Sequence, residues 1–215
     1  MKITIIYDNE IYKKDIGLKS DWGFSCVIET ENATILFDAG AKGNILLRNM
    51  KILNIDTGNI DKIVISHEHG DHSGGLNVLT PLIGNTELYR LVKESLSENM
   101  HLISVEEPRK ITEEVYITGR IEGSVDEQSL ILNGKNGWYV LVGCSHPGVE
   151  KILDTAKRYG SVVGLVGGFH GFDNFSILKD LDLVCPCHCT KHKREIKELY
   201  PQTCTDCGVG KVIEI

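Results

Sequence analysis

The sequence predicts a layered α/β fold in which two β-sheets pack face to face and helices cover their outer faces. Short segments rich in β-branched residues recur along the chain, and about eleven of them have the pattern of strands. These strands come in runs, with helical patterns between the runs. Because a sheet must bury its apolar face against another layer, this order favours two stacked sheets with helices outside them.

Length and composition predict one domain that spans residues 1–215. The chain is 41% hydrophobic and 25% charged, which suffices for one sizeable core, and no repeat or linker marks a boundary.

A net charge of -7 argues against a surface that binds nucleic acid. The apolar segment at residues 1–7 is too short for a signal-peptide core, and no stretch is long enough to span a bilayer. We expect a cytoplasmic protein with a small-molecule substrate and with no nucleic-acid or membrane partner. Nothing in the sequence indicates an oligomeric state.

Strands are expected where β-branched and aromatic residues cluster between turn residues. The first such segment, at residues 2–7, is followed by Asp8 and Asn9, whose residue types favour a turn. Like Glu68, these two residues are also weaker candidates for the functional site. The expected strands are residues 2–7, 24–29, 33–37, 62–66, 101–105, 115–118, 129–132, 138–142, 162–166, 181–185 and 211–215.

Helices are expected where apolar residues recur at helical spacing. Pro147 stands where one such pattern begins, and Gly160 follows its end, which are the positions that these two residues favour. The expected helices are residues 43–53, 75–83, 87–96, 147–159 and 191–199.

Four good metal-binding side chains fall within six residues directly after the strand expected at 62–66: His67, His69, Asp71 and His72. With eight histidines in 215 residues, chance would place such a pattern in fewer than about one chain in a thousand. Imidazole nitrogen and carboxylate oxygen are ligands that zinc, iron(II) and manganese accept, and the absence of sulfur argues against a purely structural thiolate site. The run therefore predicts a hydrolytic metal centre.

Three further histidines, His146, His170 and His188, each follow an expected strand. The carboxyl ends of strands are where the ligand sites of layered α/β proteins collect. A single histidine at such a place is more often a hydrogen-bonded structural residue. Together with the first cluster, however, these three extend the predicted site.

The predicted centre would hold one or two divalent metal ions, with zinc preferred and manganese or iron as alternatives. Such an ion can lower the pKa of bound water to roughly 7 and can polarise a phosphoryl or carbonyl oxygen. Asp71 is expected to be a ligand and a proton acceptor. We find no convincing Ser-His-Asp arrangement and no phosphate-binding glycine loop in the sequence.

Four stretches, in chain order, resemble the motifs of the metallo-β-lactamase superfamily: Thr34-Ile35-Leu36-Phe37 with Asp38-Ala39-Gly40, the run from His67 to His72, His146 and His188. This resemblance covers nearly the whole chain. It implies a four-layer αββα sandwich of two mixed sheets, with a one- or two-metal site along one edge. It further implies that Asp38 orients a metal-binding histidine by contacting the ring nitrogen that does not bind the metal. The implied ligands are His67, His69 and His146 for the first metal, and Asp71, His72 and His188 for the second.

One position departs from the superfamily pattern. Between its third and last motifs the superfamily usually places a bridging Asp or a Cys, whereas this chain has Gly167-Gly168-Phe169-His170. An imidazole cannot bridge two metals as a carboxylate can. We expect His170 to ligate one metal, and the alternatives are that it supports a ligand or contacts the substrate as a catalytic residue.

Shorter stretches resemble one branch of the superfamily, which includes 7,8-dihydropterin-6-methyl-4-(β-D-ribofuranosyl)-aminobenzene-5'-phosphate synthase and many metal-dependent hydrolases. Among them are Trp22-Gly23-Phe24-Ser25, Gly143-Cys144-Ser145-His146-Pro147-Gly148 and Pro186-Cys187-His188-Cys189-Thr190. The resemblance implies a hydrolase that acts on a small phosphoryl or carbonyl substrate. A transferase of pterin cofactor biosynthesis and an iron-binding redox module are the alternatives.

Seven cysteines form a separate signal. Cys26 and Cys144 lie in strand patterns and are expected to be small buried hydrophobic residues. Cys185, Cys187 and Cys189 alternate along an expected strand and should share one face, which leaves His188 on the other.

Cys204 and Cys207 have the two-residue gap of a thiolate half-site or a redox pair, but a second half-site of that spacing is lacking. Reduced thiols are preferred for the cysteines near the end of the chain. A disulfide and a structural zinc or Fe–S site are the alternatives.

Overall fold

Two β-sheets stacked on each other form the centre of the molecule. The computed structural model describes residues 1–84, 86–92 and 100–215. Among these residues, one sheet has seven strands and the other has six.

The first sheet combines antiparallel and parallel pairing. Its strands are β1 (Lys2–Tyr7), β2 (Ser25–Glu29), β3 (Thr34–Phe37), β4 (Lys62–Val64), β5 (Thr86–Arg90), β6 (Met100–Ser104) and β13 (Val212–Glu214). Their order across the sheet is β13-β1-β2-β3-β4-β5-β6. The pairs from β13 to β3 are antiparallel, and those from β3 to β6 are parallel.

The second sheet is also mixed. Its strands are β7 (Arg109–Lys110), β8 (Val115–Ile117), β9 (Leu130–Gly134), β10 (Gly137–Val142), β11 (Val162–Gly168) and β12 (Leu183–Cys187). Their order is β12-β11-β10-β9-β8-β7, and β10, β11 and β12 run parallel to one another.

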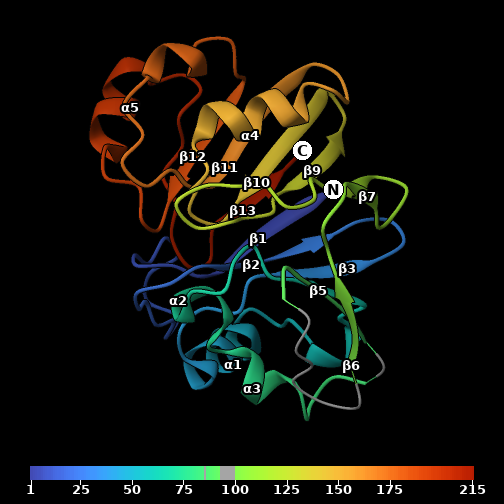
Figure 1. Ribbon diagram of the computed structural model, residues 1–215. Coiled ribbons are helices and arrows are strands. Elements are labelled where there is room, and N and C mark those ends of the chain that lie inside the picture. Colours follow the sequence, from blue (N-terminus) through green and yellow to red (C-terminus); the bar gives the residue numbers. More distant parts are fainter. Residues whose placement is uncertain (85, 93–99) are drawn as a thin grey trace.

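Helices cover both outer faces. They are α1 (Gly43–Ile52), α2 (Gly70–Ser73), α3 (Leu76–Leu79), α4 (Val149–Ala156) and α5 (Lys193–Leu199), with 3-10 turns at Thr57–Asn59 and Phe175–Leu178. Figure 1 shows α4 and α5 outside the second sheet, and α1 and α3 outside the first. The four-layer αββα sandwich expected for the chain is therefore confirmed.

The apolar residues form three layers of core. The cluster between the sheets includes Ile5, Phe37 and Leu130, all fully buried. A second cluster lies under α1 and α3, and a third lies between the second sheet and α4. The buried residues of α4, Val149, Ile152, Leu153 and Ala156, recur at helical spacing and form the face that packs on the sheet.

The helix predicted at residues 87–96 is wrong where the structure describes it. Residues 87–90 belong to β5, while residues 93–96 lie outside the described residues. β5 is an interior strand that pairs in parallel with β4 and β6, and Leu88 and Tyr89 are both buried although they point to opposite faces. A strand buried on both faces lacks polar alternation, so its pattern resembles that of a buried helix.

Other boundaries differ less. The helix predicted at 75–83 is the short α3, and the one predicted at 147–159 begins two residues after Pro147. The two-residue β7 and the single-turn α2 were not predicted, because neither is long enough to show a periodic pattern. Within the described residues, we find no helix with the length and apolarity needed to cross a membrane.

Candidate metal centre

The carboxyl ends of strands from both sheets meet along one edge of the sandwich and carry the predicted site residues. Asp38 follows β3, and the His67–His72 run follows β4 in the first sheet. In the second sheet, His146, His170 and His188 follow β10, β11 and β12. The fold thus brings together histidines that are more than a hundred residues apart in sequence.

His67, His69 and His146 form the first group. The Nε2 atom of His67 lies 3.1 Å from Nδ1 of His69, and the ring of His146 is centred 4.8 Å from that of His67 and 4.9 Å from that of His69. The other ring nitrogen of His67 is paired with Ser66 Oγ at 2.9 Å. This contact leaves Nε2 of His67 directed toward the other two rings.

His72, His188 and Asp71 form the second group, next to the first. Nδ1 of His72 lies 2.7 Å from Asp38 Oδ2, and Nδ1 of His188 lies 2.9 Å from Asn9 Oδ1. Their Nε2 atoms lie 3.9 Å and 3.2 Å from Asp71 Oδ2, respectively. In both histidines one nitrogen is held by the protein, so the other faces the centre of the group. This is the usual arrangement of metal-ligating histidines.

Cys144 lies between the two groups, a position that the sequence did not reveal. Its Sγ is 3.2 Å from Nε2 of His72. Together with His67 and His146 it forms one cluster of potential metal donors, and with His72 and His188 it forms another. Cys144 is buried as predicted, but its thiol belongs to the polar centre rather than to the apolar core. The end of β11 carries His170 rather than a carboxylate, and the Cys144 thiol is the group that lies between the two sets of histidines.

The residues present fit a divalent metal ion. Zinc–nitrogen bonds of about 2.0–2.1 Å in a tetrahedral site put two ligand nitrogens about 3.3–3.4 Å apart. The 3.1 Å separation of the His67 and His69 nitrogens is close to that value. Nε2 of His146 is buried and has no hydrogen-bond partner among the described residues. A buried imidazole nitrogen without a partner is costly unless it binds something else.

Burial and the neighbouring imidazoles keep His67 and His146 neutral. Burial is the main cause that lowers the pKa of His146 to about 4, and it holds the pKa of His67 still further below its ordinary range. Neighbouring imidazoles act in the same direction. In the second group, burial opposes ionisation of Asp71, but contacts with His188 and His72 lower its pKa overall. At neutral pH His67 and His146 therefore offer free lone pairs and Asp71 offers a carboxylate, the forms that metals bind. For His72, burial lowers the pKa, but the charge and contact of Asp38 raise it overall.

Asp38 holds both the first histidine loop and His72. It is fully buried, and its Oδ1 accepts a hydrogen bond from the Ser66 backbone N–H at 2.7 Å. Its Oδ2 accepts one from Ser66 Oγ at 2.8 Å and contacts His72 Nδ1. This is the position that the predicted orienting role requires. Ser66 links the carboxylate to His67, a connection that residue types alone did not indicate.

We expect Asp38→Asn to weaken metal affinity or activity by roughly 10–100-fold while the fold stays intact. An amide offers only one acceptor oxygen, so it cannot accept both from the Ser66 backbone N–H on one side and from Ser66 Oγ and His72 on the other. Metal titration and far-UV circular dichroism of the purified variant check this, with Asp180→Asn, an exposed aspartate, as the matched control. Unchanged metal affinity and turnover in Asp38→Asn would show that Asp38 does not orient a ligand.

Glu127 holds the loop that carries Cys144 and His146. This fully buried carboxylate accepts four backbone N–H groups, from Gly143, Cys144 and Ser145 on Oε1 and from His146 on Oε2, at 2.9–3.1 Å. The loop approaches the other sheet so closely that a Cβ at Gly143 would lie 2.1 Å from Ser66 Oγ. Sequence reasoning missed Glu127, because nothing in its local sequence shows that its partners lie sixteen or more residues away.

Replacing Glu127 with Ala should lower the free energy of unfolding by about 3 kcal/mol or more, since several buried N–H groups lose a charged acceptor. Urea unfolding of the metal-depleted protein measures the change. Glu122→Ala, at an exposed glutamate of the same segment, is the control and should stay near the parent value. A loss below about 1 kcal/mol in Glu127→Ala would mean that water replaces the carboxylate at little cost.

Unusual backbone conformations gather at this edge. Among the described non-glycine residues with positive φ, four lie here: Asp38 (57°), Ser145 (61°), His170 (46°) and His188 (44°). A non-glycine residue held in this region costs of order 1–3 kcal/mol and persists only where its surroundings enforce it. The contacts of Asp38, Glu127 and Asn9 described above supply that enforcement.

His170 lies outside both donor clusters that contain Cys144, as do His69 and Asp71, but unlike those two its side chain makes no hydrogen bond or ion pair among the described residues. Its side chain is exposed, and its ring is centred 5.0 Å from that of His146. It lines a pocket of about 220 Å³ together with His146, Ser124, Phe172 and Asp173. This placement beside a pocket favours the substrate-contact alternative for His170 over the ligand role.

The cysteines near the end of the chain lie differently from the prediction. All seven cysteines are free thiols. Cys185 and Cys187 face the core between the sheets, but Cys189 lies beyond the end of β12, with its Sγ near the Cys144 carbonyl. The expected shared face of the three is therefore wrong for Cys189, because the strand ends before it.

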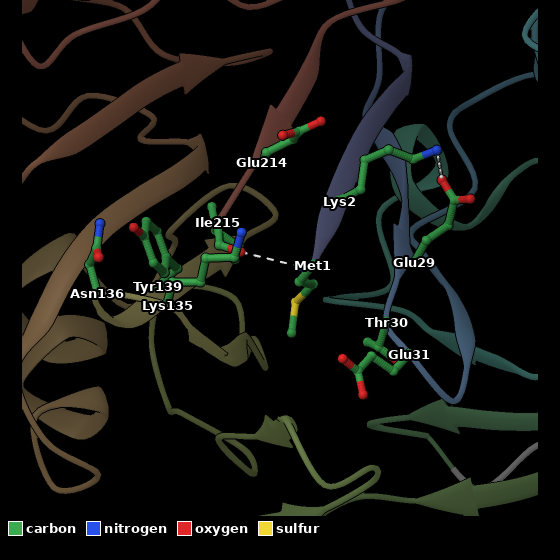
Figure 2. Close-up of a pocket in the computed structure, with 10 residues that line it drawn as sticks. All are labelled: Met1, Lys2, Glu29, Thr30, Glu31, Lys135, Asn136, Tyr139, Glu214 and Ile215. Atoms are coloured by element: carbon green, nitrogen blue, oxygen red, sulfur yellow. Dashed lines mark hydrogen bonds and ion pairs between the residues drawn. The ribbon is translucent and has the colours of Figure 1, made fainter.

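A larger pocket lies at the opposite end of the sandwich. Figure 2 shows this cavity of about 530 Å³, where the Met1 amino group donates to the Ile215 carbonyl and Lys2 pairs with Glu29. It adjoins the start of β1, whereas the histidines lie past its far end. None of the described residues that line it carries an imidazole or a thiol, so its size does not make it the candidate site.

Several known proteins resemble this chain over most of its length. The model of the metallo-beta-lactamase superfamily matches residues 23–154. An uncharacterized protein of Methanocaldococcus jannaschii is 30% identical over 99% of this chain and 100% of its own. From the same organism, 7,8-dihydropterin-6-methyl-4-(beta-D-ribofuranosyl)-aminobenzene-5'-phosphate synthase is 25% identical over 91% of this chain and 90% of its own. A crystal structure described as a metal-dependent hydrolase of the beta-lactamase superfamily has a TM-score of 0.78 and 25% identity, covering 100% of this chain and 99% of that one.

Proposed function

The chain belongs to the metallo-beta-lactamase superfamily, and from this premise we propose that it is a metal-dependent hydrolase that acts on a small phosphoryl or carbonyl substrate. One observation carries the proposal: two adjacent groups of potential metal donors share one edge of the sandwich and open beside a small pocket. The solved structure of a metal-dependent hydrolase with 25% identity supports the same reaction class.

In this proposal the first metal is held by His67, His69 and His146. The second is held by His72, His188 and Asp71. Cys144 lies close to the donors of both groups. Its thiol would therefore take the place of the carboxylate that the superfamily usually has after the strand corresponding to β11. Zinc fits a donor set of imidazole, thiolate and carboxylate, and manganese or iron(II) are the alternatives.

A divalent ion bound there would act as a Lewis acid that polarises a phosphoryl or carbonyl oxygen and acidifies water. The remaining work falls to the protein. Asp71, held ionised by its contacts with His188 and His72, can accept a proton near the centre. His170, exposed at the pocket beside His146, can donate a proton to the leaving group. The pocket of about 220 Å³ admits a small substrate.

Metal analysis of protein purified without added metal, followed by a substrate screen, tests the proposal. The screen contains phosphodiesters, phosphomonoesters, thioesters and lactones. Colourless protein that contains zinc or manganese and hydrolyses one of these classes is the expected result. Visible absorbance with bound iron, and no hydrolysis, would favour the redox alternative and overturn the proposal.

A second candidate is a transferase of the pterin-synthase type. The 25% identity to the dihydropterin enzyme over most of both chains is one reason to retain it. The other is Trp22, whose indole is 59% exposed and is centred 4.9 Å from the ring of His188. An exposed indole next to a reaction centre offers a flat apolar surface on which a heterocycle can stack.

If the substrate carries such a ring, Trp22→Ala should raise its KM by about two- to tenfold, the size of one lost aromatic contact, with little change in kcat. Trp22→Phe keeps an aromatic face and should stay near the parent. Steady-state kinetics on paired substrates with and without an aromatic ring give the comparison. Equal KM changes for both substrates would remove the stacking role.

A further inference from the structure

Three buried thiols, those of Cys185, Cys187 and Cys207, meet beside β12 in the core between the two sheets. Cys185 and Cys187 are two residues apart on β12, so both point into the core between the sheets. The segment that carries Cys207 lies alongside β12, where Val184 and Cys204 form a parallel bridge and the Thr205 N–H donates to the Val184 carbonyl at 2.9 Å. Cys207 then reaches the same core.

The thiol spacing suits one metal ion. The Sγ atoms of Cys185, Cys187 and Cys207 all lie within 4.8 Å of one another, and those of Cys185 and Cys187 are 3.9 Å apart. Zinc–sulfur bonds of about 2.3 Å in a tetrahedral site put two thiolates about 3.8 Å apart. Donors this close surround a single ion rather than a cluster of several irons.

Asp8 provides an oxygen donor beside the thiols. It is fully buried, and its Oδ2 lies 3.6 Å from Cys207 Sγ. In a tetrahedral zinc site, a carboxylate oxygen and a thiolate sulfur lie about 3.5–3.7 Å apart. Three thiolates and one carboxylate complete four-coordination, the number that structural zinc sites use.

The surroundings also suit an ion. Lys193 and Lys211 are the cations whose charges act on the Cys185 thiol, and they offset part of the negative charge of such a donor set. Cys207 lines a surface pocket of about 250 Å³ whose wall also contains Glu10, Lys193 and Asp206. This pocket gives a metal a path to donors that are otherwise closed off.

We propose that Cys185, Cys187, Cys207 and Asp8 form a second metal site, which takes one zinc ion and has a structural role. The site ties the segment before β13 to β12. It is separate from the proposed hydrolytic centre and does not depend on its activity. Cys204, the other half of the predicted two-residue-gap pair, is not a member, because only Cys207 points to the thiol group.

The proposed thiol site is connected to the histidine centre, which is the site formed by His67, His69, Asp71, His72, His146 and His188, and the connecting residue is Asp8. Its Oδ2 accepts the His188 backbone N–H at 2.8 Å, and its Oδ1 accepts that of Glu10 at 3.0 Å. An ion that fixes Asp8 therefore also fixes the backbone of His188, which is held in the left-handed region. This makes Asp8 a positioning residue for the histidine centre.

Zinc content and cobalt spectroscopy test the proposal. Cobalt bound by thiolates has an intense sulfur-to-metal charge-transfer band, which imidazole and carboxylate ligands do not produce. We expect the parent to show this band, and Cys207→Ser to lose most of it together with one zinc per chain. Cys204→Ser is the matched control, since it removes a cysteine three residues away, and it should keep both the zinc and the band.

Two further variants separate the sites. Cys144→Ser and His67→Ala alter the histidine centre, and both should retain most of the band even where hydrolysis is lost. A band that disappears in Cys144→Ser alone would overturn the proposal, because its only source would then be the histidine centre. A cobalt-loaded parent with no such band would also overturn it, and this result does not depend on whether Cys207→Ser folds.

Discussion

His67→Ala protein should contain little metal in its histidine centre and should show no measurable hydrolysis. The His67 ring lies centrally, 4.2 Å from His72, 4.7 Å from His69 and 4.8 Å from His146 between ring centres. Its removal leaves the first metal with too few ligands to be held, and a metal-dependent reaction stops with it. His69→Ala should behave in the same way. Metal analysis and turnover on the best substrate of the screen give the two readouts.

The matched control is His101→Ala, which removes an exposed histidine of β6, far from the histidine centre in sequence and in the sheet. It should match the parent in metal content and rate. Because the proposed thiol site holds its own zinc, the expected change in His67→Ala is a partial loss of total zinc. Parent-level metal in His67→Ala would contradict the ligand assignment.

His170→Ala should keep the metal of both groups and lose about 100-fold or more in turnover, the size expected for a lost acid–base group. Its ring lies beside His146 at the pocket, outside the donor clusters. The pH profile of kcat should lose one of its two limbs in the variant. Loss of a merely structural histidine would leave the shape of this profile unchanged. His192→Ala, at another histidine outside the clusters, is the control.

Two other outcomes for His170→Ala would contradict this assignment. Loss of metal would make His170 a ligand, as first expected from its position after a strand. Full metal content with full turnover would return it to a structural role. Separate measurements of metal and rate distinguish the two.

Most of the fold could be predicted from the sequence because its strands follow one another in separate apolar segments. β1, β3 and β10 lie within a residue or two of their predicted ranges, since turn residues flank each of them. β5 could not be predicted in this way. Its neighbours on both sides bury both of its faces, and that burial depends on tertiary pairing rather than on local pattern.

The histidines of the candidate centre could be located because each follows a strand and because His67, His69 and His72 lie close in sequence. The residues that hold them could not. Glu127 and Ser66 act through hydrogen bonds to distant or backbone partners that the sequence does not indicate. Asn9 was only a weaker candidate, because its residue type favours a turn. Cys144 resembled a core cysteine because it lies in a strand pattern. Only the structure shows that its thiol lies between the two groups of histidines.

We propose above that the histidine edge of the sandwich holds a catalytic divalent metal. The most direct test is to strip the parent protein with a chelator, restore zinc or manganese in steps, and measure metal per chain and turnover of the best substrate in the same samples. We expect the stripped protein to be inactive, and we expect turnover to rise with restored metal until the histidine centre is full. Metal-free protein that hydrolyses the substrate at the parent rate would contradict it.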